Sequence, residues 1–215
     1  MPDLAFRIEG AEVLEYAAVP SLSFKLRIEN LDDEPIRSVS LNTQVRIAAT
    51  QRHYEEAEQD RLLELFGEPS RWGTTLRSLL WTHTVVQVPA FSGSTVVDMP
   101  VTCTYDLEVV AAKYFHALED GEAPLEFLFS GTVFYAGEDG RMQITRISWE
   151  KEAEFKMPVR LWKEMMERYF PNSAWLRLRR DAFDQLYDYK TRMGLPTWEA
   201  TVESLMRASE PEVER

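Results

Sequence analysis

The sequence predicts an α+β fold: mainly an antiparallel β-sandwich, immunoglobulin-like or similar, with inserted helices and a C-terminal helical lobe. Apolar and polar residues alternate in several segments before residue 157, which is typical of strands with one buried face. Helical periodicity appears near residues 53–66 and 106–119 and takes over after residue 158. Strands that are followed by helices, without alternating strand–helix–strand units, favour antiparallel sheets.

A β-hairpin is the predicted centre of the sandwich. Its strands, Leu125–Tyr135 and Arg141–Phe155, are rich in apolar residues and flank a glycine-containing turn. The first strand carries apolar residues on both pleat faces, so we expect a central strand that is covered on both sides. In the second strand the apolar set changes parity between Ile144 and Ile147, which predicts a β-bulge near Thr145-Arg146.

The remaining elements follow from the same two periodicities. Further strands are expected near residues 4–16, 22–29, 39–48, 79–88 and 97–105. Pro100 predicts that the last of these is an edge strand. We expect residues 1–157 to form the sandwich, residues 158–208 to form helices docked on the sheet, and residues 209–215 to form a flexible tail.

Composition limits the classes of function. The chain has 215 residues and a net charge of −12, which argues against nucleic-acid binding because phosphate contacts need clustered lysine and arginine. The sequence shows neither a leader-like start nor a long apolar segment, so we expect a soluble cytoplasmic protein without a membrane partner. Cys103 is the only cysteine, which excludes an internal disulfide and predicts a buried, inert thiol.

No catalytic signature is present. The three histidines, His53, His83 and His116, have no second histidine at the spacing that builds zinc sites. Nucleophile elbows and phosphate-binding loops are also missing from the sequence. We therefore predict no catalytic residue, cofactor or metal, and a protein that is not an enzyme. The acidic residues are interpreted as solvated helix faces, both in the group Asp181, Asp184 and Asp188 and in the group Glu55, Glu56 and Glu58.

One basic, aromatic segment is the candidate partner-binding site. Residues 156–192 carry more basic than acidic side chains within an otherwise acidic chain. Arginine beside aromatic side chains suits an acidic partner surface. The predicted partner-binding residues are Trp162, Tyr169, Trp175, Arg177, Arg179 and Arg180. The alternative is that these arginines pair internally with the acidic sandwich and hold the helices in place.

The C-terminal part of the sequence resembles a bacterial, largely actinobacterial, family of unknown function. The resemblance rests on Met157-Pro158-Val159, Tyr169-Phe170-Pro171-Asn172, Trp175-Leu176-Arg177-Leu178 and Gly194-Leu195-Pro196-Thr197-Trp198. That family is associated with gene neighbourhoods of nickel–iron hydrogenases. The resemblance implies an accessory or assembly role near a metalloenzyme, and it supplies no catalytic residues.

Two function hypotheses follow. The first is a non-catalytic accessory or interaction protein, such as an assembly or maturation factor for a hydrogenase, whose partners would be hydrogenase subunits or maturation proteins. The second is a binding module for a small apolar or anionic ligand held between sheet and helices. A large enclosed pocket lined by Trp81, Phe129, Trp149 or Trp162 would favour the second hypothesis.

Overall fold

The structure is a computed structural model that describes residues 2–32, 34–137, 140–174 and 176–209. The strands are β1 (Leu4–Val13), β2 (Ser21–Asn30), β3 (Ile36–Ile47), β4 (Leu79–Val88), β5 (Ser94–Thr102), β6 (Glu122–Ala136), β7 (Met142–Arg146) and β8 (Glu152–Pro158). The α-helices are α1 (Glu56–Phe66), α2 (Trp72–Thr75), α3 (Val110–Ala117), α4 (Val159–Tyr169), α5 (Arg180–Arg192) and α6 (Trp198–Ser209). The chain divides into two compact units, Met1–Trp175 and Leu176–Arg215.

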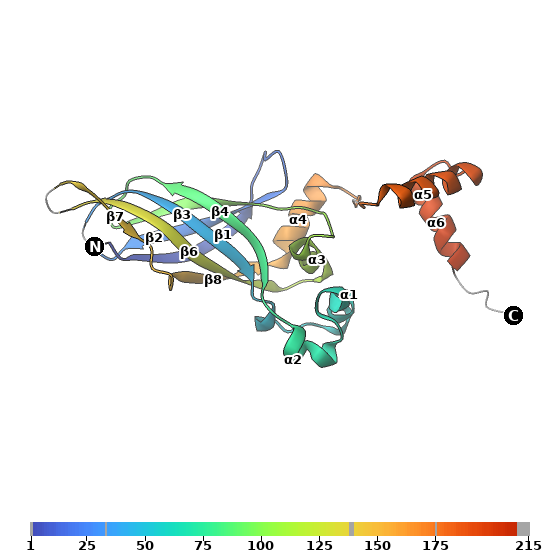
Figure 1. The fold of residues 1–215 in the computed structure, drawn as a ribbon, viewed down its shortest axis with the longest axis horizontal. Coiled ribbons are helices and arrows are strands. Elements are labelled where there is room, and N and C mark those ends of the chain that lie inside the picture. The colour runs from blue at the N-terminus through green and yellow to red at the C-terminus, as the bar shows by residue number, and fades with distance from the viewer. Residues whose placement is uncertain (1, 33, 138–139, 175, 210–215) are drawn as a thin grey trace. The chain divides into compact units, whose positions relative to one another are not determined.

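Two antiparallel sheets form the first unit (Figure 1). One sheet has the order β1-β2-β5, and the other has the order β4-β3-β6-β7, with β8 also paired to β6. The predicted α+β class with a sandwich of antiparallel sheets is confirmed. Pro100 lies in β5, which ends the first sheet in that order, as its missing N–H group requires.

The core lies between the sheets because the alternating apolar residues of each strand point to the same side. In β2, the side chains of Leu22, Phe24, Leu26 and Ile28 are completely buried. Phe127 of β6 meets Phe24 edge-on, with 5.1 Å between ring centroids. Cys103 is also buried, as predicted, and burial raises the pKa of its thiol to about 12.

Strand β6 is central, since it pairs with β3 on one side and with β7 and β8 on the other. Its two faces are not equally covered, however. Phe127 and Phe129 are buried, whereas Leu128 and Phe134 on the opposite face are only half-buried. The prediction of full cover on both sides is therefore wrong, because one face of this sheet packs on the other sheet and the second face is largely open.

The predicted β-bulge at Thr145-Arg146 is also wrong. The segment 147–151 interrupts the strand and separates β7 from β8. Arg146 pairs with Thr132, and Glu152 pairs with Leu128. Between these pairs the chain advances by six residues (152 − 146) while β6 advances by four (132 − 128), so β7 and β8 are separated by two extra residues. An even number of extra residues leaves the facing of the side chains unchanged. Met142 and Ile144 consequently lie on the outer face and are exposed.

Helices α1, α2, α3 and α4 gather at one end of the sandwich (Figure 1). Helix α4 begins at Val159, directly after its N-cap residue Pro158, and its apolar stripe contacts β1, β2 and β8. The buried members of that stripe are Val159, Trp162, Met165 and Met166. Within the described residues, the structure has no helix with the length and apolar character needed to cross a membrane.

Gly131 in β6 lies at a close approach between the backbones of β6 and β3. Its φ is +140°, and a Cβ atom there would overlap the carbonyl oxygen of Ser40 in β3. We expect Gly131→Ala to lower the free energy of unfolding by about 3 kcal/mol in urea denaturation. Gly10→Ala is the matched control, because a Cβ at Gly10 meets nothing within 4 Å. Equal stability of the two variants would contradict this account of β6.

Candidate functional site

Aromatic rings fill the sandwich interior. Phe129 stacks on Phe6 at 4.3 Å between centroids, and Trp81 packs against Phe24 and Phe115. A void lined in part by Trp81 and Cys103 measures only about 70 Å³, too small for an organic ligand. These side chains therefore stabilise the core.

Trp149 and Trp162 have opposite environments. Trp149 is 89% exposed in the segment between β7 and β8, so it does not line an interior pocket. Trp162 in α4 is only 3% exposed and stacks on Phe115 of α3. One edge of Trp162 reaches an open cleft at the helical end of the sandwich.

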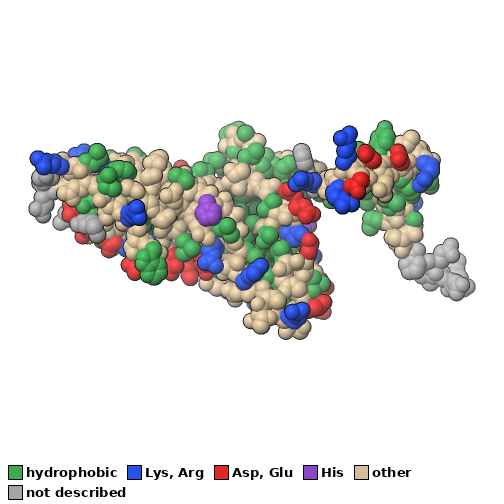
Figure 2. Space-filling view, in the orientation of Figure 1, with side chains coloured by type: hydrophobic (Ala, Val, Ile, Leu, Met, Phe, Trp, Pro, Cys, Tyr) green, Lys and Arg blue, Asp and Glu red, His purple; other side chains and the backbone are tan. Residues whose placement is uncertain are grey.

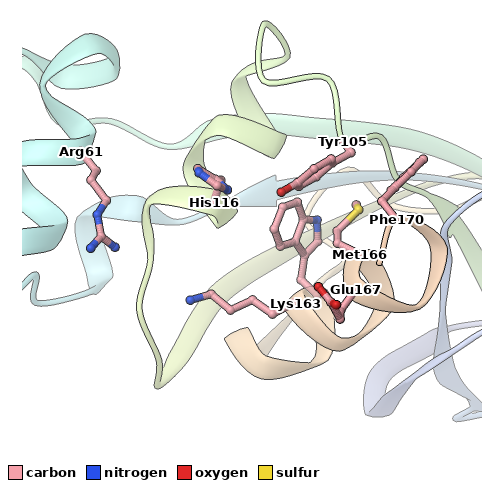
Figure 3. A pocket seen from close by; sticks show the side chains of 8 residues that line it. Arg61, Tyr105, His116, Lys163, Met166, Glu167 and Phe170 are labelled. Carbon is pink, nitrogen blue, oxygen red and sulfur yellow. The ribbon is translucent and has the colours of Figure 1, made fainter. Parts of the chain in front are cut away.

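This cleft is the candidate site. It has a volume of about 450 Å³ and lies where α1, α3, α4 and the segment after β5 meet (Figure 3). Its lining residues are Arg61, Tyr105, His116, Trp162, Lys163, Met166, Glu167 and Phe170. The volume is in the range of small-molecule sites, which is roughly 300–1,000 Å³.

The cationic side chains of the cleft are held by the segment after α3. Arg61 of α1 donates to the carboxylate of Glu119, with 2.8 Å between Nη2 and Oε1. Lys163 of α4 donates to the backbone carbonyl oxygen of the same residue at 2.7 Å. Glu119 thus holds one side chain from each of two helices and places two positive charges at one end of the cleft.

A buried network, here called the Arg52 network, fixes that segment in turn. Arg52 Nη2 lies 2.6 Å from Glu58 Oε1 of α1, and the guanidinium also donates to the carbonyl oxygens of Asp120 and Glu122. Glu58 Oε1 accepts a further hydrogen bond from the backbone N–H of Glu119 at 2.8 Å. Glu58 is 2% exposed, so the prediction that it lies on a solvated face is wrong. Its carboxylate is buried because Arg52 neutralises it.

Two buried tyrosines lie beside the Arg52 network. The Tyr54 hydroxyl donates to the carbonyl oxygen of Ala49 at 2.7 Å, which leaves its oxygen to accept from Tyr114 at 2.8 Å. Burial raises the pKa of Tyr114 to about 12 and raises that of Tyr54 still further. These phenols stay protonated and join the segment before α1 to α3.

His116 faces the cationic end of the cleft. Its partial burial, together with the positive charges of Lys163 and Arg61, lowers its pKa. Burial and the two positive charges all favour the neutral imidazole. Tyr105 lies edge-on to its ring at 6.2 Å.

The three histidines lie on separate elements. His53 precedes α1, His83 lies in β4, and His116 lies in α3. Among the described residues, histidine, cysteine, aspartate and glutamate side chains form no group of three or more that could hold a metal ion.

The structure divides the predicted partner-binding residues between its two units. In the first unit, Trp162 is buried and the Tyr169 hydroxyl donates to the carbonyl oxygen of Ala17 at 2.9 Å. In the second unit, Arg177, Arg179 and Arg180 are exposed, and Arg179 pairs with Asp181 at 3.0 Å. Trp175 lies outside the described residues.

The second unit is a pair of helices with few buried side chains. The rings of Phe183 and Tyr187 in α5 lie near Trp198 of α6, at centroid distances of 5.3 and 6.2 Å. Tyr189 and Ser204 share a hydrogen bond of 2.9 Å between the same helices. Figure 2 shows hydrophobic side chains on the surface of these helices, beside charged ones. The periodicity of an amphipathic helix predicts an apolar face but does not tell what covers it.

Two packed antiparallel sheets with helices at one end define a mixed α+β sandwich protein. The chain belongs to a family of unknown function, DUF6084, whose model matches residues 1–214. The predicted membership in a family of unknown function is confirmed. No curated protein sequence matches the chain.

Several solved structures share a distant similarity with the chain. A CARDB domain from Pyrococcus furiosus, in complex with di-metal ions, is 14% identical over 73% of this chain and 92% of its own, with a TM-score of 0.29. A β-glucosidase from Kluyveromyces marxianus is 13% identical over 73% of this chain and 15% of its own, with a TM-score of 0.25. Similarities at this level carry no argument about function.

The tyrosine pair predicts how stability depends on pH. Folding raises the pKa of Tyr114, so the folded state keeps a proton that the unfolded chain releases near pH 10. The free energy of unfolding should therefore fall as the pH rises from about 10 to about 12. Tyr114→Phe should reduce this slope by about 1.4 kcal/mol per pH unit in urea titrations. Identical slopes for the wild type and the variant would contradict the assignment.

Proposed function

We propose that the protein is a non-catalytic accessory protein that binds a protein partner through the helix pair α5–α6. The observation that carries the proposal is the exposure of this pair. None of the residues of α5 is buried, and Thr201 is the buried residue of α6. Helices of this length are marginal in isolation, because most helical stability comes from packing of an apolar face.

Exposed apolar side chains lie on both helices and on the residues that flank α5. They are Leu176, Leu178, Phe183, Tyr187, Met193, Trp198, Val202, Leu205 and Met206. Exposed apolar groups of this kind are typical of interaction sites, and aromatic residues are enriched at their centres. Arg177, Arg179 and Arg180 precede or begin α5 and supply a basic border, which suits a partner with an acidic surface.

The proposed partner is a hydrogenase subunit or a hydrogenase maturation protein. This choice follows from the resemblance to a largely actinobacterial family that is associated with nickel–iron hydrogenase gene neighbourhoods. The protein would act in the cytoplasm as an assembly or maturation factor. Docking would use charge to orient the partner and apolar contact to hold it.

Affinity capture from the native host tests the proposal. The wild-type protein should retain a hydrogenase subunit or maturation protein, identified by mass spectrometry and then purified for binding measurements. Replacing Tyr187 and Met206, which are 53% and 63% exposed, by aspartate should weaken binding at least about a hundredfold, because hot-spot truncations cost about 2 kcal/mol or more each. Arg177→Glu with Arg180→Glu should slow association and increase its salt dependence.

Two controls distinguish the outcomes. Trp149→Ser removes an exposed aromatic residue from the sandwich unit and should leave partner binding unchanged. Because Tyr187 also contacts Trp198 within the pair, circular dichroism must show that the Tyr187→Asp, Met206→Asp variant keeps the helix content of the wild type. Full binding by such a folded variant would overturn the proposal. Retention of the same hydrogenase protein by all variants would overturn docking through α5–α6, and retention of no hydrogenase protein would overturn the partner assignment.

A further inference from the structure

The cleft between α1, α3 and α4 has two chemically different ends. Arg61, His116 and Lys163 lie toward one end, and Tyr105, Met166 and Phe170 lie toward the other (Figure 3). A single ligand that spans the cleft would therefore need a polar head and an apolar body. The residues that line the cleft belong to the first unit, whereas the helix pair proposed above to bind a protein belongs to the second.

The polar end favours a negative charge. Lys163 Nζ has one hydrogen bond to the Glu119 carbonyl oxygen, and an ammonium group has three donors, so donors remain for a ligand. Burial is the main cause of the lowered pKa of His116, and the positive charges of Lys163 and Arg61 lower it further. A carboxylate placed here would be attracted by both fixed charges.

The charge of the ligand is limited by the acidic groups that face the same space. Arg61 already pairs with Glu119 at 2.8 Å, so its guanidinium is partly neutralised. Glu167 of α4 also lines the cleft and repels a second negative charge. A monoanion fits this balance better than a phosphate dianion, because Glu167 would repel the second negative charge.

The apolar end is built from flat rings. Tyr105 and Phe170 stack at 5.6 Å between centroids with 14° between their planes, and the Trp162 ring lies 6.1 Å from Tyr105. Met166 adds a polarizable thioether to the same wall. Such a wall favours an aromatic body over a flexible aliphatic chain, because rings gain from offset stacking and lose little conformational entropy.

We propose that this cleft binds a small aromatic monocarboxylate, with the carboxylate at Lys163 and His116 and the ring against Tyr105, Trp162 and Phe170. The cleft volume of about 450 Å³ accommodates a body of one or two fused rings. The ligand would be bound and released unchanged.

NMR titration of the full chain with 2-naphthoate tests the proposal. The three histidines give few ring signals, and the signal of His116 is identified by its loss in His116→Asn. Bound 2-naphthoate should raise the pKa of His116, because the carboxylate offsets the charges of Lys163 and Arg61, while the titrations of His53 and His83 stay unchanged. Neutral 2-naphthamide and ring-free acetate should bind at least about tenfold more weakly.

Matched lysine variants complete the test. Lys163→Gln should weaken 2-naphthoate binding about tenfold, since it removes one charge-assisted hydrogen bond. Lys156→Gln, an exposed lysine in β8 that does not line the cleft, should bind like the wild type. Equal affinities for 2-naphthoate and 2-naphthamide, an unchanged His116 titration, tighter binding of inorganic phosphate, or no binding at all would each overturn the proposal.

Discussion

The buried ion pair between Arg52 and Glu58 is the contact on which the helical end of the sandwich depends. One guanidinium joins helix α1 to the segment that links α3 with β6, through hydrogen bonds to the carbonyl oxygens of Asp120 and Glu122. Glu58 extends the network to the backbone of Glu119, whose side chain and carbonyl oxygen bind the cations of the cleft. The Arg52–Glu58 pair therefore holds the cationic residues of the cleft in place, although neither residue of the pair lines the cleft.

Periodicity predicted the strands and helices well where one face is buried. The clean alternation of β2 and the prolines that flank α4 fix these elements locally, so their bounds could be predicted. The break between β7 and β8 could not, because it accompanies the unusual backbone of Gly131 and its close approach to Ser40 of another strand. That approach is a tertiary contact, and sequence spacing carries no sign of it.

The candidate site was less predictable than the fold. Glu58 belongs to an acidic run and was interpreted as solvated, although its spacing of four residues from Leu62 and eight from Phe66 places it on the buried stripe of the helix. The cleft brings together side chains from α1, α3, α4 and the segment after β5, which are far apart in sequence. Trp162 was singled out as a partner-binding residue, and the structure gives it a role in the core and in the wall of the cleft.

A double-mutant cycle on Arg52 and Glu58 tests most directly whether this pair organises the helical end. Each single replacement by methionine leaves a buried charge without its partner and should cost about 3–5 kcal/mol in the free energy of unfolding. The double variant removes both charges and should cost much less than the sum, which corresponds to a coupling energy of about 3 kcal/mol. Additive losses, with a coupling energy near zero, would contradict the central role of the pair.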